Sequence, residues 1–219
     1  MLMIIKISLV IIIFGLMSSL NFAEATYGKK TSAIQPPIKK PIKPPFDTCT
    51  LRGSHADLHG CDLHNINFQH VDLSGANLSH ANLAGANLSY VKLLDANLSY
   101  ANLDNADLYF AALYNIDLRG AHLSHANLSL ADLSYAKLIS ADLSYARLVD
   151  TDLQYANLNN ATLLNASLND ADLYYATLTN SNLSNAIIQN AILTGISANG
   201  CHGTLIGIPQ SGTVPVCRS

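Results

Sequence analysis

The chain has 219 residues, of which 12% are charged, and a formal net charge of −3. It lacks the basic surplus of a nucleic-acid-binding domain, so no direct binding to nucleic acid is expected. The mean hydropathy of +0.21 owes much to the N-terminal segment 1–25 and to regularly spaced leucines, so it does not indicate a membrane protein.

Residues 1–25 have the pattern of an export signal. Lys6 precedes an apolar run from Ile7 to Met17, and Ala23-Glu24-Ala25 supplies the small-x-small pattern of a cleavage site. Cleavage there makes Thr26 the mature N-terminus. The alternative is an uncleaved anchor, but the run is short for the ~20 residues that span a bilayer. We therefore expect an exported protein, periplasmic or secreted, without a transmembrane segment after cleavage.

Residues 26–48 form an arm in which five lysines stand among five prolines: Lys29, Lys30, Lys39, Lys40, Lys43, Pro36, Pro37, Pro41, Pro44 and Pro45. Because proline fixes φ and removes a backbone donor, we expect a stiff, polyproline-like linker rather than a packed element. With Arg52, residues 26–55 carry six cations against Asp47, a net charge of +5. The arm is either a solvated spacer or a contact to an anionic surface.

Residues 49–55 contain one repeat-like unit that is out of register, and we expect them to cap the N-terminal end of the regular region. From Ala56 to Gly195, a small residue, a polar residue and a leucine then return every five positions. This run makes 28 pentapeptides, with leucine at every third position except Phe68 and Ile188. Such internal periodicity is the strongest structural signal in the chain.

A period of five fits neither regular element. The leucines would lie about 140° apart on a helix and on alternate faces of a strand. A chain that turns a corner every five residues can point every leucine at a common axis. The stretch is therefore predicted to be a solenoid whose coils stack about 4.8 Å apart.

The recurring Ala-Asn-Leu-Ser-Tyr and Ala-Asp-Leu-Ser-Tyr units resemble the pentapeptide repeat family. The resemblance implies an all-β fold, a right-handed four-sided parallel β-helix with four pentapeptides in each coil. On that basis the run makes about seven coils and a rod about 34 Å tall. The family has no common activity, so the fold does not define the function.

Residues 196–219 lose the five-residue period and gain glycine and proline, so a C-terminal cap or tail is expected. Just before it, Ile187 and Ile192 stand where a polar residue is usual. Either the tail or a second subunit covers them. Because some pentapeptide repeat proteins pair through their C-terminal ends, the resemblance keeps a homodimer open.

The four cysteines lie at the two ends of the predicted solenoid: Cys49, Cys61, Cys201 and Cys217. An even number in an exported chain indicates disulfides. Three pairings are possible, and we favour pairing within each end, 49 with 61 and 201 with 217, because the ends should stand tens of ångströms apart. The alternative is a zinc site with His55, His59 and His64, which no CxxC spacing supports. No metal or cofactor is expected.

Thirteen aspartates against four Lys or Arg give the repeat region a net charge of −9. With four pentapeptides in each coil, every fourth pentapeptide lies on the same side. The alignment predicts an aspartate column beside a tyrosine column: Asp132, Asp152, Asp172, Tyr135, Tyr155 and Tyr175. Stacked like charges repel unless a cation or basic partner offsets them, so this is a candidate interaction face. The alternative is that aspartate is the commonest outward residue and that the tyrosines stack for stability.

No catalytic residues are expected, because the repeat supplies serine, histidine and aspartate everywhere and a leucine-filled axis leaves no substrate cavity. We favour an exported, non-enzymatic acidic rod, a protein-interaction or structural module of the bacterial envelope or extracellular space, with an unknown partner. The resemblance implies an alternative, since some members are cytoplasmic DNA mimics that bind DNA gyrase and inhibit or protect it. The charge of −9 suits such mimicry, whereas the signal, the cysteines and the basic arm oppose it.

Overall fold

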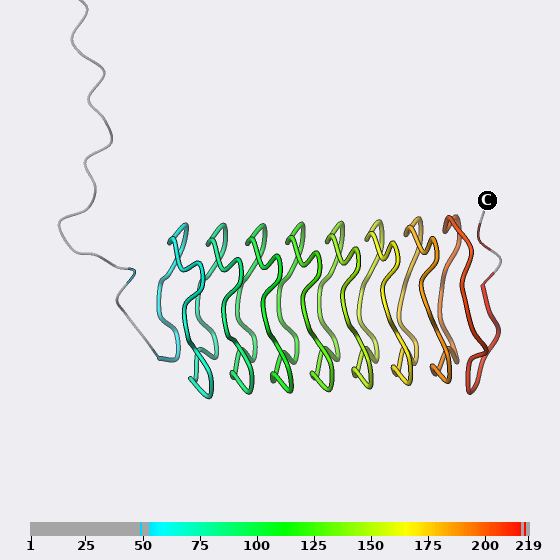
Figure 1. Ribbon diagram of the computed structural model, residues 1–219, viewed down its shortest axis with the longest axis horizontal. Helices are drawn as coiled ribbons and strands as arrows, with labels where there is room; N and C mark the ends of the chain where they lie inside the picture. The colour runs from blue at the N-terminus through cyan, green and yellow to red at the C-terminus, as the bar shows by residue number, and fades with distance from the viewer. Residues whose placement is uncertain (1–48, 50–52, 216, 218–219) are drawn as a thin grey trace, which may run out of the picture. The chain divides into compact units, whose positions relative to one another are not determined.

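The computed structural model describes residue 49, residues 53–215 and residue 217. The predicted signal (1–25) and arm (26–48) lie outside the described residues. The described chain winds as a solenoid (Figure 1), and its strand pairing consists of one-residue parallel bridges. From Asp57↔Asn77 to Asn182↔His202 each bridge joins positions 20 apart. Each coil therefore contains four pentapeptides and four turns.

Every backbone N–H of a typical pentapeptide has a hydrogen-bond partner. Three of the five donate to carbonyls of neighbouring coils, and one closes the turn. The fifth donates to the side chain of the Asn or Asp at the second position, which explains why 18 of 28 units carry one of these residues there. Residues 76–80 are an example, with N···O distances of 2.7–3.3 Å. The N–H groups of residues 77, 78 and 80 donate to the carbonyls of Ala56, Asn97 and Ser99 on neighbouring coils. The N–H of residue 76 donates to the carbonyl of Leu73, and that of residue 79 donates to Oδ1 of Asn77.

The corner of each pentapeptide is a β-turn with one left-handed residue. The residue two after the leucine has a φ of +54° to +61° wherever it is not glycine. Positive φ at that position alone marks a type II turn, which favours glycine or asparagine. Six corners nevertheless carry tyrosine, for which this conformation costs about 1–2 kcal/mol. These corners need a compensating interaction.

The leucines point to the axis of the rod, as predicted. All 28 third-position side chains, from Leu58 to Leu193, are at most 4% exposed. Thr151 and Ser181 replace the usual alanine, and their hydroxyls donate to the carbonyls of Leu128 and Leu178 at 2.8 and 2.7 Å. Since burying one leucine contributes about 2 kcal/mol, this column is the main source of stability.

A disulfide and a large side chain lie at the N-terminal end of the rod. Cys49 is bonded to Cys61, with the Cα atoms 5.6 Å apart, which is the pairing favoured from the sequence. In the same first coil Phe68 replaces a leucine and is 1% exposed. The disulfide therefore ties the incoming chain to the first coil.

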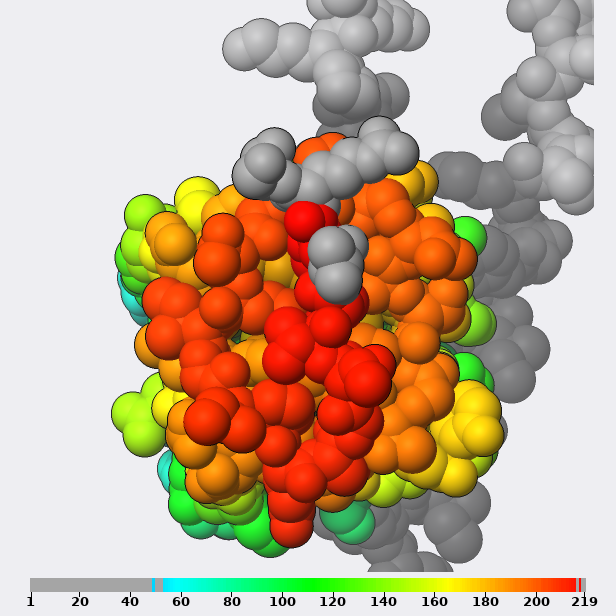
Figure 2. Space-filling model, turned by 90° about the vertical axis from the view of Figure 1, so that its right-hand side faces the viewer, coloured from blue at the N-terminus to red at the C-terminus, as the bar shows by residue number. Residues whose placement is uncertain are grey.

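The backbone ladder continues past Gly195, where the leucine period ends. Its last two bridges join Ile187 to Ile206 and Ile192 to Ser211, and each spans one position fewer than the bridges before it. Backbone pairing does not require leucine, so the segment expected to be a cap continues as a further, shortened coil. It lies across the end of the rod (Figure 2), and the two outward isoleucines, Ile187 and Ile192, are half-buried.

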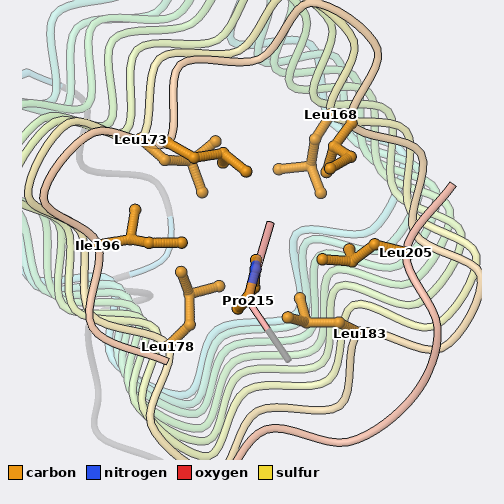
Figure 3. Close-up of a pocket in the computed structure, with 9 residues that line it drawn as sticks. Leu168, Leu173, Leu178, Leu183, Ile196, Leu205 and Pro215 are labelled. Atoms are coloured by element: carbon orange, nitrogen blue, oxygen red, sulfur yellow. The ribbon is translucent and has the colours of Figure 1, made fainter. Parts of the chain in front are cut away.

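Pro215 closes the C-terminal end of the axis. It lies among core side chains that include Leu168, Leu173 and Leu183 (Figure 3). The apolar void left between them is about 10 Å³, which is at most the room of one water molecule. The axis beneath Pro215 therefore offers no space for a substrate, whereas a more open hollow of about 340 Å³ at the same end is lined by residues that include Ile196, Gly200 and Pro215.

The second disulfide joins Cys201 to Cys217, with the Cα atoms 4.7 Å apart, which is again the favoured pairing. Some apolar side chains remain exposed at this end, with Ile206 at 49%, Ile208 at 74% and Val214 at 44%. Pairing of two copies through this end stays a prediction.

Candidate interaction face

Three bridged aspartates and three corner tyrosines lie on one side of the rod. The bridges Asp132↔Asp152 and Asp152↔Asp172 place the aspartates on consecutive coils. The tyrosines occupy the turn that follows, and their rings stack in the same order. We call this surface the Asp–Tyr face, defined by Asp132, Asp152, Asp172, Tyr135, Tyr155 and Tyr175.

Each aspartate of the Asp–Tyr face has a structural hydrogen bond that does not depend on its charge. Its Oδ1 accepts the N–H of the residue two positions later, at 2.9–3.0 Å. The side chains of Asn157 and Asn182 accept the same bond elsewhere in the rod at 3.1 Å. This hydrogen bond therefore needs an oxygen on the side chain and not a carboxylate.

The carboxylates of the Asp–Tyr face have no Lys, Arg or His within ion-pair distance among the described residues. The pairs in that part of the chain lie elsewhere, between Arg119 and Asp117 and between His64 and Asp62. One carboxylate does have polar compensation from an amide, since Gln154 Nε2 donates to Asp172 Oδ2 at 2.7 Å. The negative charge of the face is therefore not neutralised within the described residues.

The central aspartate of the column has an altered acidity. Burial raises the pKa of the Asp152 carboxyl, and the charges of Asp132 and Asp172 add to the rise. The hydrogen bond from the N–H of Gln154 opposes it. At neutral pH the deprotonated carboxylate is thus destabilised, and a cationic ligand would relieve this cost.

Two further carboxylates border the Asp–Tyr face and were missed from the sequence. Asp150 and Asp170 occupy the exposed corner that precedes the aspartate strand on consecutive coils. Oδ1 of Asp170 accepts a hydrogen bond from Asn190 Nδ2 at 3.0 Å. A comparison of corner residues that lie one coil, or 20 positions, apart in the sequence would have found them. With them, the coils of the Asp–Tyr face carry five carboxylates on this side of the rod.

The tyrosine rings stack along the rod and turn their edges outward. Ring centroids of Tyr135 and Tyr155 are 5.0 Å apart at 13°, and those of Tyr155 and Tyr175 are 5.8 Å apart at 9°. The column ends at Gly195, where an added Cβ would lie 3.0 Å from the Tyr175 ring. Because the neighbours cover the ring faces, the 44–51% exposure of these residues belongs mainly to edges and hydroxyls. A partner would meet a ridge and not a flat aromatic platform.

The other corners of the rod also carry stacked rings. His70 stacks on Tyr90, and His80 stacks on Tyr100 at 5.1 Å. Such contacts contribute about 0.5–1.5 kcal/mol each and offset the strain of a bulky left-handed residue. Stacking is therefore a general stabilising device of this rod. The combination with unpaired aspartates distinguishes the Asp–Tyr face.

The described residues contain no group of three or more His, Cys, Asp or Glu side chains arranged to hold a metal ion. His59 and His64 are exposed, and each forms a hydrogen bond with a nearby side chain, Ser79 and Asp62 respectively. The cysteines of the alternative zinc site are disulfide-bonded. Among the described residues, we find no helix with the length and apolar character needed to cross a membrane.

A family model described as pentapeptide repeats matches the chain in eight copies, over residues 54–89, 81–120, 111–148, 146–185 and 166–202. Together these ranges cover the whole repeat region and reach into the segment that follows it. No curated protein sequence matches the chain.

Several solved structures are similar to the chain. A pentapeptide repeat protein of Nostoc PCC 7120 is 42% identical over 42% of this chain and 69% of its own, with a TM-score of 0.26. Rfr23 of the cyanobacterium Cyanothece 51142 is 29% identical over 70% and 90%, with a TM-score of 0.35. QnrB1, a plasmid-mediated fluoroquinolone resistance protein, is 20% identical over 68% and 89%, with a TM-score of 0.45.

Proposed function

The chain belongs to the pentapeptide repeat family, and we propose that it is an exported, non-enzymatic rod of about seven coils that acts in the bacterial envelope or extracellular space. Members of this family fold as right-handed four-sided β-helices and generally serve as structural or interaction modules. The Asp–Tyr face is the binding surface of this rod. The partner is a protein segment that presents lysine or arginine to the carboxylates.

The observation that carries this proposal is the unpaired charge on one side of the rod. Like charges on adjacent coils about 4.8 Å apart repel by about 0.9 kcal/mol in water. Asparagine would supply the same hydrogen bond without that cost, as it does at Asn157. A cationic partner converts this repulsion into attraction and gives the aspartates a role that asparagine lacks.

Export is supported by the two disulfides, since such bonds persist in oxidising compartments. The test is the intact mass of the protein from its native source, measured without reductant. We expect a chain that begins at Thr26 and is lighter by four hydrogens. A full-length, reduced chain would contradict export.

The binding face is tested with a basic probe, an oligolysine peptide carrying a fluorophore, titrated against the mature protein. The triple variant Asp132→Asn, Asp152→Asn and Asp172→Asn should bind the probe about tenfold more weakly, because three exposed ion pairs of about twofold each multiply. An unchanged affinity of the triple variant for the probe would refute the proposal.

A matched control removes three charges from the other three sides of the rod. Asp57, Asp107 and Asp142 each accept the same N–H bond through Oδ1, at 3.0–3.3 Å. Replacing them with asparagine changes the net charge equally and should leave probe binding nearly unchanged. Equal loss in both triple variants would mean that net charge, and not the face, binds the probe.

The charge of −9 in the repeat region also favours a second function, mimicry of DNA toward DNA gyrase. The basic arm and the disulfides weigh against it. If the protein does mimic DNA, the purified mature protein should alter supercoiling by gyrase at about micromolar concentration. No effect at that concentration would remove this function.

A further inference from the structure

The Asp–Tyr face and the Lys/Pro arm, residues 26–48, are complementary parts of the same chain. We propose that the Asp–Tyr face of one molecule binds the arm of a second copy, so that the protein assembles with itself. This inference rests on the proposed function, because it names the basic partner that the face takes.

Charge is the first ground for this assignment. The arm contains five lysines and one aspartate and so has a net charge of +4. The coils of the Asp–Tyr face carry five carboxylates on that side, and no basic group among the described residues pairs with them. Opposite charges of similar number favour association at low salt.

The spacing of the lysines is the second ground. In the polyproline conformation expected from the sequence, residues three apart lie on one ridge about 9.3 Å apart. Lys40 and Lys43 are such a pair. Asp132 and Asp172 lie two coils apart, about 9.6 Å at the usual strand spacing. Both lysines can therefore meet carboxylates at the same time.

The prolines supply the third ground. In the expected polyproline conformation, Pro41 and Pro44 would form the ridge next to the lysine ridge, with the same spacing. On the rod, the tyrosine corner lies next to the aspartate strand. A proline-rich segment is already stiff, so it would lose little conformational entropy on packing against this ridge of tyrosine edges. The pairing of a lysine ridge with aspartates thus places a proline ridge at Tyr135 to Tyr175.

A second copy is the better occupant because the molecule's own arm has a long path to this face. The disulfide to Cys61 ties Cys49 to the side of the coil opposite the aspartate strand. Lys43 lies six positions before Cys49, which corresponds to about 19 Å in the polyproline conformation. Asp132 lies about 17 Å along the rod from Cys61, and the arm would also have to run around half the circumference of the rod to reach it. An arm from another molecule has no such limit.

The test is sedimentation of the mature protein, with its disulfides intact, from about 1 to 100 µM in about 20 mM salt and again in about 300 mM salt. We expect the mean mass to rise with concentration in low salt and to fall to the monomer in high salt. A monomer at every concentration in low salt would overturn the proposal.

Variants locate the contact. The triple variant Asp132→Asn, Asp152→Asn and Asp172→Asn should weaken self-association about tenfold, while the matched triple variant at 57, 107 and 142 should leave it unchanged. Lys40→Glu with Lys43→Glu should abolish association. Mixing that variant with one carrying Asp132→Lys and Asp172→Lys should restore a mixed complex. Association that survives the face variant would place the contact elsewhere and refute the proposal.

One further measurement separates this inference from the proposed function. A synthetic peptide of residues 26–48 is titrated against mature protein in which Lys39, Lys40 and Lys43 are glutamine. If the peptide binds while the unaltered protein stays monomeric, self-assembly is refuted and a basic partner for the face is retained. If neither the peptide nor oligolysine binds, both proposals fail.

Discussion

Replacing Asp152 with asparagine removes the central charge of the aspartate column and retains its hydrogen bond. Oδ1 of Asp152 accepts the N–H of Gln154 at 2.9 Å, and Asn157 accepts the equivalent bond at 3.1 Å. Bridges place Asp132 and Asp172 on the two adjacent coils. The substitution therefore isolates the effect of charge repulsion and desolvation on stability.

The expected gain follows from the spacing of the charges. Two neighbours at about 4.8 Å each repel by about 0.9 kcal/mol in water, and salt screening lowers the sum. We expect Asp152→Asn to raise the free energy of unfolding by about 1 kcal/mol near pH 7, or the melting temperature by about 2–4 °C.

The gain depends on pH in a defined direction. The pKa of Asp152 is raised in the folded protein from its ordinary 3.8, so the folded state binds this proton more tightly than the unfolded state. The unaltered protein therefore loses stability as pH rises from about 3.8 through the folded pKa, and the loss is complete above it. The advantage of the variant should be present near pH 7 and absent near pH 3.

The assay is urea unfolding at both pH values, followed by circular dichroism. Asp57→Asn is the control, because Asp57 accepts the same type of bond while its bridged neighbour is Asn77 and not another aspartate. It should give a smaller gain. A loss of stability in Asp152→Asn, or an equal gain at both pH values, would refute the reasoning.

Three further predictions concern the core, the end and the corners. Leu128→Asp buries a charge without a partner at a cost of several kcal/mol, so circular dichroism should show no folded rod. Reduction of Cys201–Cys217 removes a link across 16 residues worth about 3 kcal/mol and should lower the melting temperature; an unchanged value would exclude a stabilising role. Gly120→Ala puts a Cβ 2.6 Å from a tyrosine ring and should destabilise more than Gly60→Ala, which has similar φ and nothing within 4 Å; equal losses in thermal unfolding would contradict this.

The repeat made most of this fold predictable. A leucine every five residues identifies each inward side chain, and coils of four pentapeptides then assign every outward residue to a column. The structure agrees for the buried run from Leu58 to Leu193 and for both cysteine pairs. The columns of the Asp–Tyr face follow from the same arithmetic, and so do Asp150 and Asp170, although they were overlooked.

Two features were not predicted, each for a physical reason. The ladder continues to Ser211 although the leucines stop, because pairing uses backbone groups that carry no sequence pattern. The tyrosines at 135, 155 and 175 stack at 5.0–5.8 Å, as one of the two interpretations of the sequence had it, but it was not predicted that their edges would face outward. Ring orientation depends on side-chain rotamers, which periodicity does not determine.

The hydrogen bonds between coils run along the rod, and this determines how it responds to force. A pull from the N-terminal side passes through the Cys49–Cys61 bond and first loads the bonds that follow Cys61, such as Leu63 N–H to Asn82 O at 2.7 Å. The coils should therefore peel off one after another at low force instead of shearing together, and each releases four pentapeptides, about 65 Å of chain. The Cys49–Cys61 bond keeps the segment between the two cysteines out of the force path, so a tethered rod would hold its length until the rest of the first coil yields and then extend in steps.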